Sequence, residues 1–344
     1  MPDPAEHPPL ANPNTARTAA PGPGDTLWPC RVILLSCALV LAYQYFAQVH
    51  YHFIEQSIAR HREIVSGTAG SPYRYRVLVP FVLDPVIGLI ARWTAYRNAF
   101  LGVYAAYDAF AIGFSLLATF AYLGRWFRST MALAGTLYMA VMMTLALRDH
   151  YFMPWSWIEP GLVAVALSWL VRGRWAAILP LTVVAGLNRE TGLIIPLLFC
   201  ATSLAPGQRD GSTQRGAFAW CAAALAAWAI VFFGLRWVLG GAAPYSSVAE
   251  LWRSNTEPLH LLRAVVQVGL FGGALWFLAP AGVRYAPEFV RRSALVVPLY
   301  LIGVLLFGMW YEVRLLIPLY PVVLPLALFA VCRLADPGAI REPA

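Results

Sequence analysis

The residues best suited to proton transfer gather at the end of the first long apolar stretch of the chain and just beyond it. They are His50, His52, Glu55, His61 and Glu63. A general base works best where it is close to the reacting group and still reached by water. The cluster therefore predicts a base for a reaction at a membrane surface, and a solvated loop without a specific role is the alternative. The histidine spacing assigns no metal site and no cofactor, while a divalent metal ion stays an open alternative.

Two arginines alternate with two tyrosines shortly after this cluster, in the order Tyr73, Arg74, Tyr75 and Arg76. In an extended segment, this alternation places both guanidinium groups on one side and both rings on the other. Two guanidinium groups placed in this way could grip a phosphate. The alternative is an aromatic belt at the membrane interface, with arginines that reach the lipid headgroups.

The segment 148–160 packs two acids, a histidine and four aromatic rings into one short connection. Its candidate binding residues are Asp149, His150, Trp155 and Glu159. Ring faces combined with carboxylates are typical of sugar-binding sites, which predicts a sugar-contacting loop. A tryptophan belt is the alternative, although a belt requires neither of the two acids.

Charged residues also stand where two apolar stretches almost join. Arg189 and Glu190 separate one pair of stretches, and Glu312 and Arg314 separate another. Charge at a membrane boundary is costly, so these residues predict either a binding site or pairs that neutralise one another. Asp108 lies deep in an apolar run and is a functional candidate, unless a tyrosine or serine satisfies its carboxylate.

The elements that position these residues must be membrane helices. Hydrophobic residues make up 60% of the 344 residues and charged residues 12%, with a mean hydropathy of +0.62. Such a composition excludes an ordinary soluble domain. The continuously apolar stretches favour helices over a β-barrel. All 25 basic residues are arginine and the net charge is +8, but the arginines are scattered between apolar stretches, which argues against nucleic-acid binding.

The chain is therefore predicted to be an all-α polytopic transmembrane bundle of about ten spans, at about 31–52, 99–122, 131–147, 158–171, 175–187, 192–204, 217–239, 262–278, 295–309 and 315–331. The segment 77–91 is short and carries Asp84 at its centre, which predicts an interfacial helix in a long first outward loop, 53–97. We expect a disordered cytoplasmic tail at 1–26, a transmembrane domain at 27–333 and a short cytoplasmic tail at 334–344. The arginine-bearing turns 125–128, 172–174 and 284–292 would then face the cytoplasm.

Three segments, YRYRVLVP, LNRET and YEVRLLIPLYP, resemble segments of bacterial polytopic proteins placed near the mannosyltransferases of the GT-C superfamily. The resemblance implies transfer of a sugar from a polyprenyl-phosphate donor to a glycan, lipid or protein acceptor, on the outer face of the bacterial cytoplasmic (inner) membrane. It implies an acid of the first outward loop as base, which by position is Glu55, with Glu63 and Asp149 as substitutes. The adjacent acidic pair usual in that family is missing from this loop.

Physical chemistry is consistent with such a reaction. Arginines at the membrane surface would stabilise the charge of a departing lipid-linked phosphate, and the candidates are Arg74, Arg76, Arg189 and Arg314. Two other functions remain open. A transporter or flippase for a lipid-linked or anionic solute would use spans broken by proline, as at Pro180. A non-catalytic assembly partner in the membrane is the third.

Overall fold

The computed structural model describes residues 27–147, 152–204, 211–241, 243–244, 247–335 and 337–341. This part of the chain is helical and contains no β-strand beyond two isolated bridges, so the predicted all-α class is confirmed. The helices are α1 (Leu27–Tyr45), α2 (Ile54–Val65), α3 (Leu78–Ile90), α4 (Tyr96–Leu123), α5 (Ser129–Ala146), α6 (Trp155–Val171), α7 (Trp175–Asn188), α8 (Ile194–Ser203), α9 (Gly211–Leu239), α10 (Val248–Thr256), α11 (Pro258–Gly272), α12 (Leu275–Gly282), α13 (Glu288–Ser293), α14 (Val296–Phe307) and α15 (Tyr320–Ala335).

Within the described residues, six helical stretches are long and apolar enough to cross a membrane: Leu27–Tyr51, Tyr96–Leu123, Ser129–Ala146, Gln214–Leu239, Glu288–Phe307 and Val313–Ala335. The helices α11 and α12 add a seventh if they form one span bent by 55°. The helices α3, α6 and α7 and the stretch Glu190–Ser203 are apolar but shorter. The chain is thus a multi-pass membrane protein, with six or seven long apolar helices among its described residues. The predicted segment 262–278 covers two helices, α11 and α12, and the other nine predicted segments are helical.

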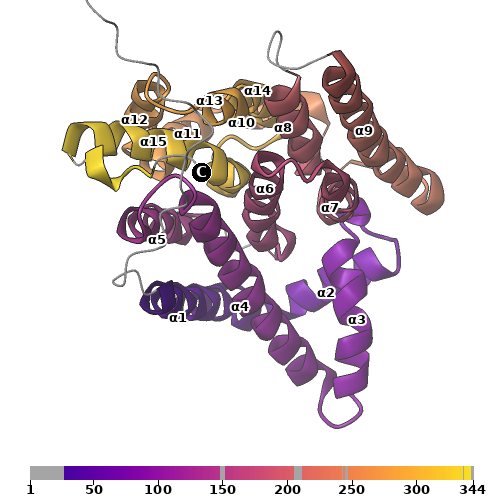
Figure 1. Ribbon diagram of the computed structural model, residues 1–344. Coiled ribbons are helices and arrows are strands. Elements are labelled where there is room, and N and C mark those ends of the chain that lie inside the picture. Colours follow the sequence, from indigo (N-terminus) through magenta and orange to yellow (C-terminus); the bar gives the residue numbers. More distant parts are fainter. Residues whose placement is uncertain are drawn as a thin grey trace, which may run out of the picture.

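The long helix α4 organises one half of the bundle. It packs against α1 and α5 on one side and against α6, α2 and α3 on the other (Figure 1). The helix α6 approaches α4 closely at Gly161, which has no side chain. A Cβ at this position would lie 2.5 Å from the Phe114 ring of α4. On the opposite side of the bundle α12 touches α15, where a Cβ on Gly282 would lie 1.8 Å from the Leu326 carbonyl oxygen.

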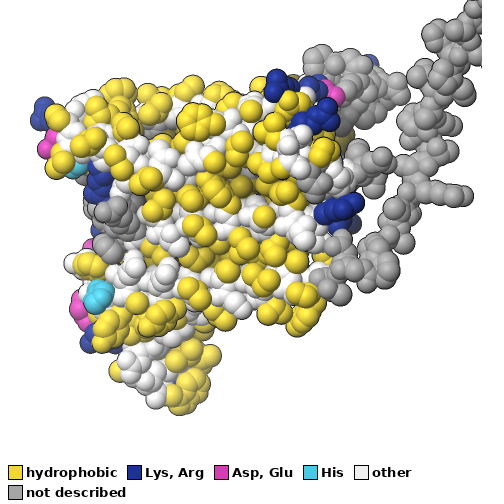
Figure 2. All heavy atoms as spheres, turned by 90° about the vertical axis from the view of Figure 1, so that its left-hand side faces the viewer, with side chains coloured by type: hydrophobic (Ala, Val, Ile, Leu, Met, Phe, Trp, Pro, Cys, Tyr) yellow, Lys and Arg dark blue, Asp and Glu magenta, His cyan; other side chains and the backbone are white. Residues whose placement is uncertain are grey.

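Hydrogen bonds group the loops into two sets. The nitrogen of Ser71 donates to the Ala243 carbonyl, and the Asn255 amide donates to the Gly308 carbonyl at 2.9 Å, which joins loops of one end. The turn after α4 meets the C-terminal residues at the other end, where Arg128 donates to Ala339. Figure 2 shows a broad hydrophobic face between two edges, with histidine and most acidic side chains at one edge and arginines at both edges. We call the first set of loops the outer end, after the side of the membrane on which we expect these loops to lie.

The helix α2 forms because its apolar residues recur at helical spacing. Ile54, Ile58 and Ile64 are buried on one face, and Glu55 and Arg62 are exposed on the other. This face joins α3, the first half of α4 and residues 152–155 in a second hydrophobic core. The predicted interfacial segment 77–91 is observed as α3, an apolar helix that exposes several large side chains, among them Phe81, Val82 and Val86.

The prediction of an extended segment at 73–76 is wrong. Tyr73–Tyr75 forms one turn of 3-10 helix, because Tyr75 and Arg76 donate their backbone N–H groups to the carbonyls of Pro72 and Tyr73, both at 3.1 Å. An extended segment would need a neighbouring strand to satisfy these groups. The two arginines therefore do not share one side: Arg76 turns towards Tyr73, while Arg74 lies near Gly67 and Gly240.

Candidate functional site

Four charged side chains from three places in the sequence meet at the outer end. Arg76 donates to both carboxylate oxygens of Glu190, with its Nε 3.2 Å from Oε2 and its Nη2 in contact with Oε1. Arg189 Nη1 lies 3.2 Å from Oε2 of Glu159, and Arg189 Nε lies 4.0 Å from Oε1 of Glu190. The hydroxyl of Thr191 donates to the other oxygen of Glu159. We call these five residues the outer ion network.

The backbone between α7 and α8 positions the centre of this network. Arg189 is extended, with φ −165° and ψ 151°, so the chain leaves α7 there and turns back into the 3-10 helix Glu190–Leu193. The turn is tight at Gly192, where a Cβ would lie 2.5 Å from the Ala185 carbonyl carbon. Arg189 is thereby held against Glu159 of α6, and both side chains are almost fully buried.

Two aromatic rings lie against the guanidinium group of Arg76. Its central carbon lies 5.0 Å from the ring centre of Tyr73 and 5.2 Å from that of Trp155. The two ring centres lie 5.7 Å apart. A cation over the face of an aromatic ring is stabilised electrostatically. The predicted residues Tyr73, Arg76 and Trp155 are thus brought together with Glu190, although they come from separate segments.

Glu312 and Arg314 form a second pair beside this network. Arg314 Nη2 lies 2.8 Å from Oε1 of Glu312 and Nε 3.3 Å from Oε2, so the predicted mutual pairing is observed here. Arg189 and Glu190 do not pair mainly with each other, because each has a closer partner on another segment. Tyr300 links the two groups: its hydroxyl donates to the Leu315 carbonyl at 2.7 Å and lies beside Thr191.

Several buried polar atoms near the start of α6 have no hydrogen-bond partner within the described part of the chain. They are Trp155 Nε1, Ser156 Oγ and Asn188 Oδ1. Buried polar atoms in proteins are almost always satisfied, so a bound polar group would complete this site. Together with the arginines, the arrangement can hold an anion whose other part offers hydroxyl groups.

An apolar cavity of about 300 Å³ opens between α11, α12, α14 and α15. Among the side chains that line it are Phe271, Leu275, Val297, Leu316 and Val323. Leu316 belongs to the 3-10 helix Val313–Leu319, which also carries Arg314 of the second ion pair. A hydrocarbon chain fits such a lining, since it offers almost no polar atoms.

The predicted acids have different environments. Glu55 is exposed on α2 and makes no ion pair within the described residues. Glu63 pairs with Arg60, with 2.9 Å between Nη1 and Oε2. Asp149 and His150 lie outside the described residues. Arg74 is half-buried, and its Nε has no hydrogen-bond partner among the described residues. Within the same residues no group of three or more metal-ligating side chains is found.

Sequence reasoning missed the partner of Asp108. The expected tyrosine or serine is not its partner, because Nε2 of His50 lies 2.7 Å from Oδ2 of Asp108. It also missed that His61 is buried, between Asp84 and Tyr104. Burial lowers the pKa of the His61 imidazole, while the hydrogen bond to Asp84 opposes that shift. The helical spacing of His61 with Ile54 and Ile58 could have placed it on the buried face of α2.

No protein-family model, curated protein or solved structure matches the chain.

Proposed function

We propose that the chain is a glycosyltransferase that moves a sugar from a polyprenyl-phosphate donor to an acceptor on the outer face of the cytoplasmic membrane. The observation that carries this proposal is the gathering of three buried arginines, Arg76, Arg189 and Arg314, at the outer end. A lipid phosphate needs cations for its head and an apolar channel for its tail, and the cavity between α11, α12, α14 and α15 has a lining apolar enough for such a tail.

The reaction breaks the bond between the sugar C1 and the phosphate oxygen, and the phosphate leaves with the electron pair. The acceptor hydroxyl loses its proton to a carboxylate as its oxygen bonds to C1. Glu55 is our candidate base, since its carboxylate is exposed, whereas Glu63 is engaged by Arg60. Arg76 is our main candidate for the leaving phosphate, because its partner Glu190 is 29% exposed and therefore reachable.

The same proposal includes the finer topology. The chain would cross the membrane about ten times, and α6, α7 and α8 would be the shorter spans. The turns 125–128 and 284–292 would then lie in the cytoplasm, and every loop of the outer end would lie outside. The helix α3 would lie in the interface, since it exposes Leu89 and the turn that follows it carries the exposed Trp93 next to Arg92. Residues 1–26 and 334–344 would be cytoplasmic tails.

A transporter of a lipid-linked or anionic solute is the second candidate, favoured by the bend between α11 and α12. One observation argues against a transporter: at the bend, the carbonyl groups at the end of α11 accept hydrogen bonds from tyrosine hydroxyls. Tyr320 donates to the Phe271 carbonyl at 2.6 Å, and Tyr138 donates to that of Gly272 at 2.9 Å. A carbonyl that already accepts a hydrogen bond is a poorer ligand for the ion that drives transport than a carbonyl without one, which a transport site is expected to offer.

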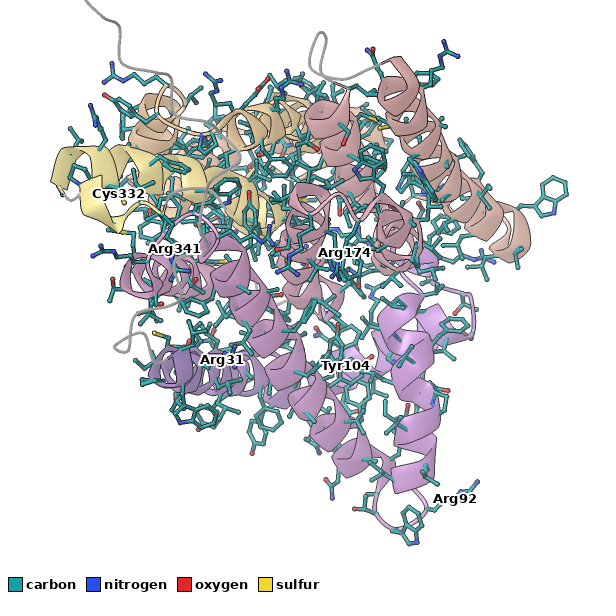
Figure 3. All side chains as sticks on the ribbon, viewed as in Figure 1. Arg31, Arg92, Tyr104, Arg174, Cys332 and Arg341 are labelled. Carbon is teal, nitrogen blue, oxygen red and sulfur yellow. The ribbon has the colours of Figure 1, made fainter. Side chains whose placement is uncertain are left out.

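Thermal unfolding of the purified protein in detergent tests the donor. A ligand that binds only the folded protein raises the unfolding midpoint. We expect a polyprenyl-phosphate sugar to raise it, and nucleotide sugars to leave it unchanged. Arg92→Ala is the control, because Arg92 stands exposed at the far tip of the α3–α4 turn (Figure 3). The control should keep the stabilisation and Arg76→Ala should lose it. A shift with nucleotide sugars alone would contradict the proposed donor.

A further inference from the structure

Two histidine–carboxylate pairs lie one after the other between α1, α2, α3 and α4. The deeper pair is His50 with Asp108, whose side chains are both fully buried and whose Nε2 and Oδ2 atoms are 2.7 Å apart. The outer pair is His61 with Asp84: His61 is fully buried, whereas the Asp84 side chain is 43% exposed. One pair therefore reaches the surface, and the other is enclosed in the bundle.

Tyr104 of α4 joins the two pairs. Its hydroxyl is 2.8 Å from Nδ1 of His61, and its ring centre lies 5.7 Å from that of His61 and 5.5 Å from that of His50. Figure 3 places Tyr104 between the ribbon of α4 and the α2–α3 pair. The sequence Asp84, His61, Tyr104, His50 and Asp108 thus forms a line of groups that can each give and take a proton, running from an exposed carboxylate to a buried one.

A purely structural polar pair would be expected to use its hydrogen-bonding atoms. Here the Nδ1 atom of His50 and the Oδ1 atom of Asp108 are buried without a hydrogen-bond partner in the described residues. The other rings around His50 belong to Tyr45, Phe100 and Phe152, which are uncharged. Besides Asp84 and Tyr104, the neighbour that acts electrostatically on His61 is Arg62 of its own helix.

We propose that these five residues form a proton path from the outer surface to the His50–Asp108 pair. Asp84 takes a proton from a hydronium ion, which leaves water, and passes it to Nε2 of His61, which releases its Nδ1 proton to the Tyr104 oxygen. Tyr104 releases its own proton through one water molecule to Nδ1 of His50. His50 then gives its Nε2 proton to Asp108, and the return transfer resets both imidazole tautomers. No bond between heavier atoms changes and no electron is exchanged.

The path gives the bundle an exchangeable proton in a region of low dielectric constant. One added proton changes the charge of the His50–Asp108 pair by a full unit, and such a change has large effects where water does not screen it. The inference does not depend on the proposed glycosyltransferase function, because none of the five residues belongs to the outer ion network.

Nitrogen NMR of histidine-labelled protein in lipid nanodiscs tests the path. The ring signals are assigned with His50→Gln and His61→Gln, and the exchange rate of the His50 ring N–H with solvent is measured. We expect measurable exchange in the wild-type protein, slowed about tenfold or more in Tyr104→Phe. Tyr138→Phe is the matched control, since the Tyr138 hydroxyl bonds a carbonyl elsewhere in the bundle, and it should leave the rate unchanged.

Two results would overturn the path. The first is that the His50 ring of the wild-type protein keeps a single tautomer and exchanges no proton with solvent from about pH 5 to 8. The other is an equal exchange rate in Tyr104→Phe and the wild-type protein. Neither result bears on donor binding, so failure of the path and failure of the proposed function are distinguishable.

Discussion

The ion pair between Arg76 and Glu190 allows stability and function to be tested separately. In Arg76→Met the side chain can still pack against Tyr73 and Trp155, but Glu190 loses its cation. Breaking a fully buried pair costs about 3–5 kcal/mol. The Glu190 side chain is 29% exposed, so solvent recovers part of this cost and we expect a loss of about 2–3 kcal/mol.

Adding Glu190→Gln to Arg76→Met removes the uncompensated charge. Replacing both partners of a buried pair is often close to neutral, so we expect the double variant to unfold within about 1 kcal/mol of the wild-type protein. Denaturant unfolding of all four forms in the same detergent measures the cycle. A double variant as unstable as Arg76→Met would mean that packing, rather than charge, causes the loss.

In the same variants, the affinity for polyprenyl phosphate should not follow the free energy of unfolding. Arg76 can offer a phosphate two charge-assisted hydrogen bonds, and loss of such bonds costs about 1.5–3 kcal/mol, which is about 10- to 100-fold in affinity. The double variant should therefore be stable and still bind polyprenyl phosphate weakly. Glu190→Gln alone should bind it more tightly, because the carboxylate no longer competes for Arg76. Wild-type affinity in the double variant would refute the role of Arg76, and Arg92→Met serves as the charge-matched control.

Three further predictions concern single residues. Glu55→Gln should abolish sugar transfer while donor affinity, measured by the unfolding shift, stays near that of the wild-type protein, because a base acts in the transition state; wild-type turnover would exclude Glu55. Because burial lowers the pKa of His61 in the folded protein, its contribution to stability is present above about pH 6.5 and is lost as the pH falls towards the lowered pKa. The acid-induced fall of the unfolding midpoint should therefore be smaller in His61→Gln, and an equal fall would contradict this reasoning. Gly192→Ala should destabilise by about 1–3 kcal/mol, because its Cβ would meet the Ala185 backbone, and unchanged denaturant unfolding would speak against the tight α7–α8 turn.

The helical architecture could be predicted from the sequence because lipid leaves few alternatives. Long apolar stretches must satisfy their backbone hydrogen bonds internally, so composition and length suffice to predict helical structure in the expected segments, although the break between α11 and α12 inside 262–278 was not predicted. Length alone is less informative about crossing, since α7 has 14 residues and α8 has 10. A helix of this length can cross only partly or with help from its flanking turns.

The candidate site was predictable in its residues but not in its partners. Charge at a membrane boundary marked Arg189, Glu190 and Arg314, because such residues are costly unless paired or used. Local spacing suggested that Arg189 and Glu190 pair together, whereas the extended backbone at Arg189 directs its side chain to Glu159 of another helix. Pairing across helices depends on tertiary packing, which spacing does not encode.

The His50–Asp108 pair illustrates the same limit. The two residues are 58 positions apart, and His50 stands at the end of the first apolar stretch, where a solvated loop was the simpler interpretation. The helical segment Phe46–Tyr51 continues α1 and carries His50 into the interface with α4. The pair becomes visible only once both helices are placed side by side.

The most direct test of the central claim follows the fate of the donor lipid. Proteoliposomes that contain the protein and a polyprenyl-phosphate sugar are mixed with a cell-envelope acceptor fraction, and mass spectrometry measures the free polyprenyl phosphate released. We predict release with the wild-type protein and with Arg92→Ala, and none with Glu55→Gln. A folded protein that binds the donor yet leaves every sugar on its lipid, whatever acceptor fraction is supplied, would contradict the account.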